Sequence, residues 1–289
     1  MLYVNSSISA VETLRAEGLD VVVGQPAGVP RIGLLNLMPE KVATEYDYCR
    51  MLTQSGLTLS VVLLRLPGET YKTTPQSYVE AHYEVFDPDN APPALDGLIV
   101  TGAPLEQMPF EAVRYWERLC RIFDWSAQHV RSTLCICWAA QAALYHSYGL
   151  PKYALDEKCF GIFRQEVLLP GHPLLNALPS VFPMPHSRHT AVDFEELPDR
   201  CLVLSAGLDT GVSLVVDETL RRVMVIGHLE YAADTLDREY RRDLARDLPI
   251  QLPEHYYHND DPAQGVDFSW AAAAQTFYRN WAASLLNDD

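Results

Sequence analysis

Short apolar runs alternate with segments of helical spacing along most of the chain, and this order limits the folds it can adopt. The predicted strands cover residues 31–37, 59–66, 97–101, 132–137 and 223–227. The predicted helices cover residues 43–55, 110–126, 138–149, 236–248 and 270–286. Strands buried on both faces read as nearly continuous apolar runs. The order therefore predicts an α/β fold with a doubly wound, mostly parallel sheet of the flavodoxin-like kind.

The sequence shows no sign of a second domain. Residues 160–216 carry shorter β-like runs, and neither an internal repeat nor a low-complexity linker divides the 289 residues. We interpret residues 1–30 as an N-terminal extension and residues 31–289 as a single domain.

Charge and cysteine content narrow the possible partners and surroundings. The formal net charge is −16, from 22 Lys and Arg against 38 Asp and Glu. This charge argues against nucleic acid and anionic membranes as main partners. We recognise no secretory signal and no apolar run of the roughly 18 residues that a membrane helix needs. The six cysteines lack zinc-site spacing, so we expect reduced thiols, no metal and a cytoplasmic protein.

Cys137 is the strongest candidate for a reactive group. The apolar run Ser132-Thr133-Leu134-Cys135-Ile136-Cys137 is followed at once by helix formers, Trp138-Ala139-Ala140-Gln141. A thiol at such a corner faces the positive end of the new helix, which is expected to stabilise a thiolate and lower the thiol pKa. Free cysteines are more often packing residues, and Cys135 and Cys159 have no feature that sets them apart from that majority.

His228 and Glu230 are the second candidate feature. They stand two residues apart near the end of the strand predicted at 223–227, and alternation along a strand would point both side chains the same way. A carboxylate beside an imidazole fixes its tautomer and stabilises the imidazolium. With Cys137 they would form a nucleophile, a general base and an orienting group. These residue types suit acyl transfer, amide hydrolysis and glutamine-dependent amination alike.

The sequence also resembles the homoserine O-acyltransferases that are built on the class I glutamine-amidotransferase-like fold. The resemblance runs in order from about Arg31 to Trp281. It is carried by five motifs: Leu35-Asn36-Leu37-Met38-Pro39, Thr101-Gly102-Ala103-Pro104-Leu105, Cys137-Trp138-Ala139-Ala140-Gln141-Ala142, His186-Ser187-Arg188 and Gly227-His228-x-Glu230-Tyr231.

This resemblance implies a mechanism in two steps. Cys137 would take the acyl group from an acyl-coenzyme A, and His228, oriented by Glu230, would activate the hydroxyl group of an amino acid. Backbone N–H groups at Trp138 and near Leu105 would form the oxyanion hole. The family further implies a homodimer that serves methionine biosynthesis, with acetyl-CoA as a co-substrate and no permanently bound cofactor.

The resemblance assigns substrate roles to four further residues. Lys158, Ser187 and Arg242 match positions where the family binds substrate. Glu106 matches the position that selects the acyl donor, where glutamate accompanies acetyl rather than succinyl. Departures from the usual motifs, such as Ala232, leave a serine acceptor as an alternative within the family, and a succinyl donor is a further alternative there. A cysteine-dependent glutamine amidotransferase or hydrolase is the alternative from another class.

Overall fold

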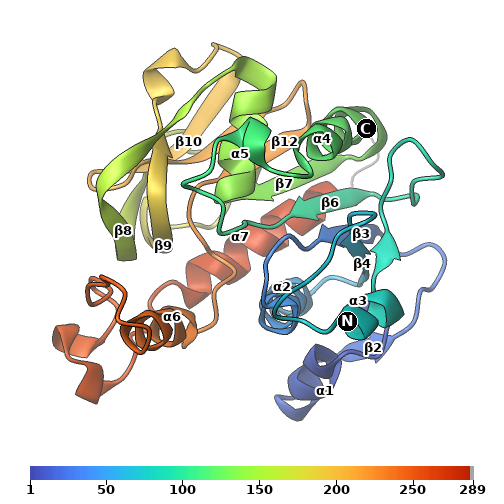
Figure 1. Cartoon of the computed structure of the whole chain (residues 1–289), viewed down its shortest axis with the longest axis horizontal. Helices are drawn as coiled ribbons and strands as arrows, with labels where there is room; N and C mark the ends of the chain where they lie inside the picture. Colours follow the sequence, from blue (N-terminus) through green and yellow to red (C-terminus); the bar gives the residue numbers. More distant parts are fainter. Residues whose placement is uncertain (287–289) are drawn as a thin grey trace.

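The computed structural model describes residues 1–286, and within them the chain forms one mixed sheet that helices cover on both faces (Figure 1). The strand order is β2-β1-β4-β3-β6-β7-β12-β11-β10-β8-β9, with β5 paired to β4. The parallel part contains β1 (Leu2–Val4), β2 (Val21–Val23), β3 (Arg31–Leu35), β4 (Leu59–Arg65), β5 (Glu84–Val85), β6 (Gly97–Val100), β7 (Ser132–Ile136) and β12 (Arg222–Val225). The predicted mostly parallel α/β fold is thus confirmed.

An antiparallel part extends the sheet beyond β12. It contains β8 (Lys152–Val167), β9 (Val181–Val192), β10 (Cys201–Gly207) and β11 (Gly211–Asp217). The sequence predicted only short runs here, whereas β8 and β9 are the longest strands of the described chain. Strands β8 and β9 pair as a hairpin that is only partly buried, and polar residues therefore interrupt their apolar pattern.

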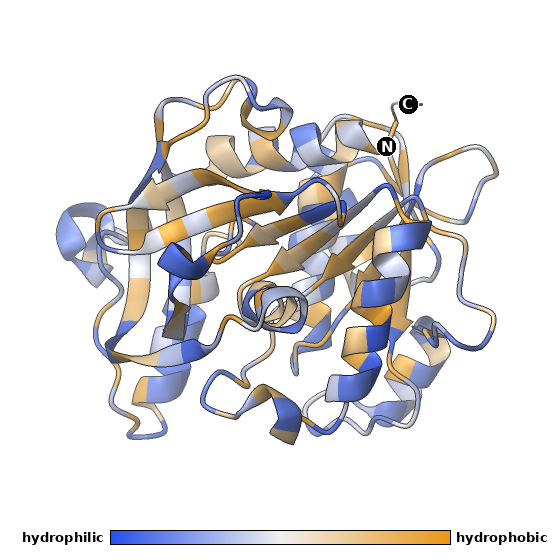
Figure 2. Ribbon diagram, turned by 90° about the horizontal axis from the view of Figure 1, so that it is seen from above, coloured by the Kyte–Doolittle hydropathy of each residue, from blue (hydrophilic) through white to orange (hydrophobic). Residues whose placement is uncertain are grey.

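The parallel strands are continuously apolar because both of their faces are buried. In β4, Val61 and Leu63 belong to one core cluster, while Val62 and Leu64 belong to the other. Figure 2 shows these apolar strands in the interior, between the layers of helices. This arrangement is the physical reason for the apolar runs seen in the sequence.

The helices divide between the two faces. Helices α1 (Ser9–Ala16), α2 (Lys41–Gln54) and α7 (Ala271–Ser284) contribute to one core cluster, and α4 (Trp116–His129) and α5 (Trp138–Tyr148) contribute to the other. Figure 1 shows the two groups on opposite sides of β6 and β7. The remaining helices are α3 (Gln76–His82) and α6 (Thr235–Leu244), with 3-10 turns η1 (Phe110–Ala112), η2 (Pro173–Leu175), η3 (Phe194–Glu196), η4 (His258–Asp260) and η5 (Pro262–Gln264). None of the helices within residues 1–286 is both long and apolar enough to cross a membrane.

The start of one helix differs from the prediction. The helix predicted from residue 110 begins at Trp116, because Phe110–Ala112 forms a separate 3-10 turn. At the N-terminus, β1 pairs with both β2 and β4, and the side chains of Val11 and Leu14 on α1 are buried in the core. The division at residue 30 remains a prediction, although residues 2–23 already contribute strands to the common sheet.

Candidate active site

Cys137 lies in a strained turn between β7 and α5. Its φ is +50° and its ψ is −113°, a backbone region that residues other than glycine rarely adopt. Its N–H donates to the Val225 carbonyl oxygen at 2.7 Å, and its own carbonyl accepts from the Gln141 N–H at 3.1 Å. These hydrogen bonds hold the strained residue from the neighbouring strand and from the first turn of α5. The predicted corner is therefore present, and it fixes the sulfur at the carboxyl end of the sheet.

His228 and Glu230 lie in the loop that follows β12. The Nδ1 atom of His228 is 2.7 Å from Glu230 Oε1, and both side chains are about 5% exposed. The strand alternation that we used to bring them together is wrong, because β12 already ends at Val225. The turn after the strand makes the contact instead, and it directs Leu229 into the core.

Close packing against β9 holds this loop. The His228 N–H donates to the Pro185 carbonyl oxygen at 2.8 Å. A Cβ atom on Gly227 would lie only 2.5 Å from Met184 Sδ and 2.7 Å from Pro185 O. Glycine is therefore required here by a close backbone approach rather than by a positive φ, and that approach places the imidazole beside the cysteine.

The imidazole of His228 lies beside the Cys137 sulfur, near enough for each group to shift the pKa of the other. Burial raises the pKa of the Cys137 thiol, while the neighbouring His228 acts against this shift. The lowered thiol pKa that we expected from the helix end is therefore wrong, because desolvation outweighs the stabilising groups. Desolvation alone would lower the pKa of His228, but the charges of Cys137 and Glu230 and their hydrogen bonds raise it well above its ordinary value. A thiolate is favourable here only beside the protonated imidazole.

Glu106 reaches the same sulfur from the loop after β6. Its Oε1 atom lies 3.8 Å from Cys137 Sγ, and its Oε2 atom accepts the His189 N–H at 2.9 Å. The negative charge of Glu106 contributes to the raised pKa of the Cys137 thiol. An acyl group attached to this sulfur would therefore be close to a carboxylate.

The two expected oxyanion donors differ in their surroundings. Trp138 is the first residue of α5, and the N–H groups of a first helical turn have no partner within the helix. The Leu105 N–H, in contrast, donates to the Ala103 carbonyl oxygen at 2.8 Å. Leu105 would have to give up this bond in order to bind an oxyanion.

The three residues that were expected to bind substrate converge on a fourth, Glu239 of α6. Its Oε1 atom accepts from Lys158 Nζ at 2.6 Å and from Ser187 Oγ at 2.9 Å, and it lies 3.8 Å from Arg242 Nη2. Sequence reasoning missed Glu239, although it precedes Arg242 by one helical turn and so shares its face. Lys158, from a bulge in β8, also lies 4.1 Å above the Phe160 ring.

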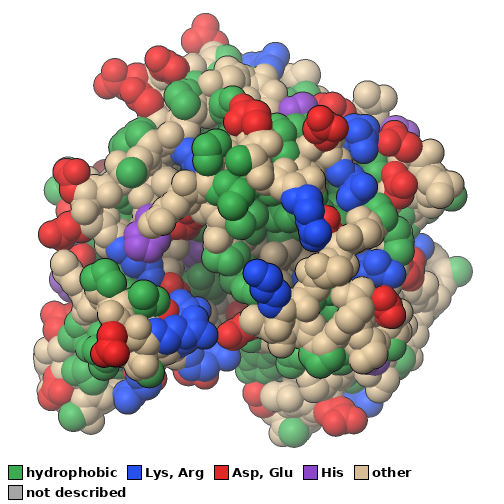
Figure 3. Space-filling model, viewed as in Figure 1, with side chains coloured by type: hydrophobic (Ala, Val, Ile, Leu, Met, Phe, Trp, Pro, Cys, Tyr) green, Lys and Arg blue, Asp and Glu red, His purple; other side chains and the backbone are tan. Residues whose placement is uncertain are grey.

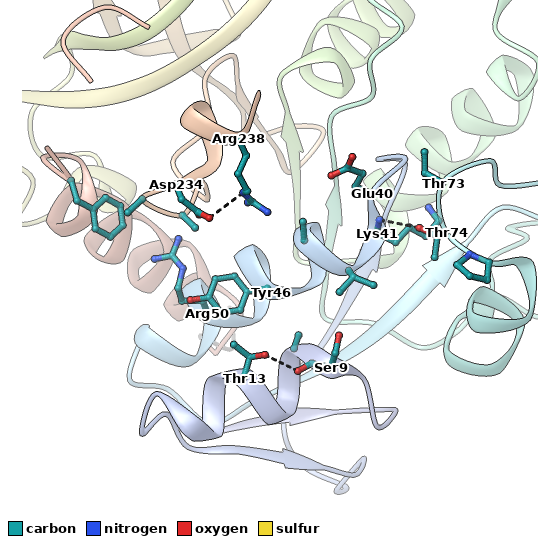
Figure 4. Close-up of a pocket in the computed structure, with 17 residues that line it drawn as sticks. Ser9, Thr13, Glu40, Lys41, Tyr46, Arg50, Thr73, Thr74, Asp234 and Arg238 are labelled. Atoms are coloured by element: carbon teal, nitrogen blue, oxygen red, sulfur yellow. Dashed lines mark hydrogen bonds and ion pairs between the residues drawn. The ribbon is translucent and has the colours of Figure 1, made fainter. Parts of the chain in front are cut away.

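A cavity of about 220 Å³ lies between the loop that carries His228 and helix α6. Its lining residues include His228, Glu230, Glu239 and Arg242. A larger cavity of about 970 Å³ lies next to it, between α1, α2 and the loop before α6, and contains none of the predicted site residues. Figure 3 shows this face hollowed between α6 and the helices α1 and α2, and Figure 4 shows the larger cavity. The two cavities share Glu40, Ala43 and Arg238 as lining residues.

Solved structures of low sequence identity share this fold. A glutamine amidotransferase from Thermotoga maritima superposes with a TM-score of 0.61 at 14% identity, covering 91% of this chain and 100% of that chain. A glutamine amidotransferase from Methylobacillus flagellatus gives a TM-score of 0.55 at 12% identity, with coverages of 89% and 94%. The protein thus has the class I glutamine-amidotransferase-like fold, as the resemblance implied.

Sequence comparison identifies the family. The profile of the homoserine O-succinyltransferase family matches residues 2–287. Homoserine O-acetyltransferase of Bacteroides fragilis is 45% identical over 95% of this chain and 92% of its own length, and that of Geobacillus kaustophilus is 47% identical over 86% and 82%. The chain belongs to the homoserine O-succinyltransferase family, whose members are homoserine acyltransferases of methionine biosynthesis.

Proposed function

We propose that this protein transfers an acetyl group from acetyl-CoA to the hydroxyl group of L-homoserine through an acetyl-Cys137 intermediate. The observation that carries the proposal is the buried contact of Cys137, His228 and Glu230, with Glu106 at 3.8 Å from the sulfur. Membership of a homoserine acyltransferase family and the names of relatives at 42–47% identity support it.

In the first half-reaction, His228 accepts the Cys137 proton as the sulfur attacks the thioester carbonyl carbon. The carbonyl π electrons move onto oxygen, where the Trp138 N–H donates a hydrogen bond. Donors of this kind typically stabilise the transition state by about 3–4 kcal/mol each. When the carbonyl re-forms, the bond to the coenzyme A sulfur breaks, and that sulfur takes the proton from the imidazolium. One thioester replaces another, so the step is close to isoenergetic.

In the second half-reaction, His228 accepts the hydroxyl proton of homoserine as its oxygen attacks the acetyl-Cys137 carbonyl. The carbon–sulfur bond then breaks, and the Cys137 thiolate regains its proton from the imidazolium. Glu230 keeps Nδ1 of the imidazole as the protonated nitrogen, so that Nε2 is the atom that exchanges protons in both steps.

The charges around α6 suit an amino acid. We propose that the Arg242 guanidinium binds the homoserine carboxylate, because its fork can donate two parallel hydrogen bonds. Glu239 would accept the ammonium group, with its carboxylate held in place by Lys158 and Ser187. Both charged ends would then lie in the cavity that also contains His228.

Glu106 supports acetyl over succinyl as the acyl group. A succinyl carboxylate about 4 Å from Glu106 would be repelled by roughly 4 kcal/mol at an effective dielectric constant near 20. Acetyl carries no such charge. We therefore expect Glu106→Gly to raise kcat/KM for succinyl-CoA relative to acetyl-CoA by at least about tenfold. An unchanged donor ratio in this variant would contradict the assignment.

The whole proposal is tested by a panel of acetyl-CoA and succinyl-CoA against homoserine and serine. Mass spectrometry after brief mixing with acetyl-CoA should show about 42 Da added to Cys137, as acetyl replaces hydrogen on the nucleophile. Cys137→Ala should show neither adduct nor turnover, whereas Cys135→Ala should keep both. Full turnover without an adduct would argue for direct transfer.

The same panel separates the alternatives. A preference for succinyl-CoA or for serine would correct the proposed donor or acceptor, but the reaction would still be acyl transfer to an amino-acid hydroxyl group. Ammonia release from glutamine would instead indicate the amidotransferase alternative. The expected cytoplasmic homodimer remains part of the proposal, and light scattering of the purified protein would test its oligomeric state.

A further inference from the structure

Helix α2 carries several buried ionisable residues, and the proposed chemistry uses neither Asp47 nor Arg50. Their exposed fractions are 5% and 6%. Burial raises the pKa of the Asp47 carboxyl group to about 8, with the charge of Arg50 lowering it and that of Glu230 raising it. Buried charges are costly unless they are paired and hydrogen-bonded, so their partners indicate why they are placed here.

Both residues hold the backbone of the loop that carries the catalytic base. Arg50 Nη2 donates to the Glu230 carbonyl oxygen at 2.8 Å and to the Tyr231 carbonyl oxygen at 3.1 Å. Asp47 Oδ1 accepts the Ala232 N–H at 3.2 Å. Three consecutive residues of the loop are therefore tied to a helix about 180 positions earlier in the chain.

The segment before α7 completes this support. Trp270 Nε1 donates to the Tyr231 carbonyl oxygen at 3.0 Å, and the Arg50 guanidinium lies 5.7 Å above the Phe268 ring. Arg50 is thus enclosed between a ring and the loop backbone. Figure 4 shows its side chain at the larger cavity, on the side where Asp234 and Arg238 also lie.

The backbone contacts matter because the Glu230 side chain is held at only one of its oxygens. Glu230 Oε1 is 2.7 Å from His228 Nδ1, whereas Oε2 is buried without a hydrogen-bond partner among the described residues. The direction of the carboxylate is then determined by its backbone and by His228 itself. We propose that Arg50 is a positioning residue: by fixing the carbonyl groups of Glu230 and Tyr231, it keeps Glu230 in line with His228. This inference rests on the proposed acyl transfer.

The chain offers a matched control in Arg222. This arginine is 2% exposed, donates to the Phe123 carbonyl oxygen at 2.8 Å and to Ser147 Oγ at 2.7 Å, and lies 5.1 Å above the Phe123 ring. Like Arg50, it has a buried Nε atom without a partner among the described residues. Arg222 contacts α4 and α5 instead of the catalytic loop, so replacing it should affect stability alone.

The experiment compares Arg50→Lys with Arg222→Lys in the full-length protein. Lysine keeps the positive charge but loses the planar fork. The readout is the pH dependence of kcat/KM for homoserine. Because homoserine reacts with the acetylated enzyme, this profile reports the pKa of His228 in a state where the Cys137 sulfur carries no proton. The groups that then face the His228 imidazole are Glu230, the stacked ring of Tyr231 and the more distant His186.

A less well aligned Glu230 raises the pKa of His228 by less, so the acidic limb of the profile should move to lower pH. For Arg50→Lys we expect a shift of about half a unit or more and a fall of about tenfold in the plateau. Both variants should show a similar loss of Tm, but Arg222→Lys should keep the wild-type profile. Trp270→Phe, which removes one hydrogen bond to Tyr231, should give a smaller shift in the same direction and carries the test if Arg50→Lys does not fold.

An unmoved profile in folded Arg50→Lys and Trp270→Phe would overturn the positioning role. Alkylation of Cys137 by iodoacetamide needs no substrate. It therefore tests the positioning role of Arg50 even if the proposed acyl transfer is wrong. A weaker Glu230 contact stabilises the imidazolium less, so alkylation near pH 7 should slow several-fold in Arg50→Lys but not in Arg222→Lys. Equal alkylation rates in the two variants would likewise contradict the inference.

Discussion

Cys137 and His228 follow neighbouring strands, β7 and β12, yet their positions depend on different kinds of structure. The cysteine is fixed mainly by its own strand, turn and helix, with one hydrogen bond from the adjacent strand. The histidine lies in an irregular loop that β9, α2 and the segment before α7 hold together. The position of Cys137 therefore depends mainly on one short segment of the chain, whereas the position of His228 depends on contacts from distant segments.

The largest expected effect comes from the loop after β12, which distant segments hold in place. Glu230→Gln removes the charge that raises the pKa of His228 and favours the wrong orientation of the imidazole. We expect kcat/KM for homoserine to fall by about 10²- to 10⁴-fold, as for comparable triads. Because the pKa of His228 falls, the acidic limb should move to lower pH. A pH profile of the variant that keeps the wild-type limb would contradict this assignment.

A smaller effect is expected from Gly227→Ala, which tests the contact between the loop and β9. The new methyl group would clash with the Pro185 carbonyl oxygen, which is backbone and cannot easily move. We expect a loss of about 1–3 kcal/mol in the free energy of unfolding, measured in urea, together with lower activity because His228 is the next residue.

Gly102→Ala is the matched control for stability. Its Cβ would lie 3.5 Å from Cys137 Cβ and 3.7 Å from His228 Cε1, which are ordinary contacts. Its free energy of unfolding should stay within about 0.5 kcal/mol of wild type. Equal destabilisation by the two alanines would show that the approach to β9 is not what requires glycine.

The smallest expected effect concerns the backbone strain at Cys137. Cys137→Gly and Cys137→Ala both remove the sulfur, so neither should transfer acyl groups. A φ of +50° has little steric cost for glycine, whereas for alanine, as for Cys137 itself, it is a strained conformation, so Cys137→Gly should be the more stable variant by about 1 kcal/mol. Urea unfolding of the two inactive proteins measures this difference directly. A more stable alanine variant would mean that the turn is not strained.

The predictions from sequence were most accurate where a signal is local. The apolar runs placed five of the parallel strands, β3, β4, β6, β7 and β12, and the change from strand to helix formers located the turn at Cys137. Two inferences went wrong because they treated a local rule as sufficient. Strand alternation does not apply to His228 and Glu230, since β12 ends before them. The effect of the helix end on the Cys137 pKa is outweighed by burial, which no local pattern reveals.

The sequence by itself determined the central parallel strands, their two buried faces and the identity of the groups available for chemistry, because apolar periodicity and residue type are properties of short segments. The motifs in their order were also sufficient to indicate the family. Only the tertiary structure brought Lys158, Ser187 and Arg242 onto Glu239 and tied α2 to the loop after β12. Such contacts join residues up to about 180 positions apart, and they depend on how the strands are ordered in the sheet, which no single segment encodes.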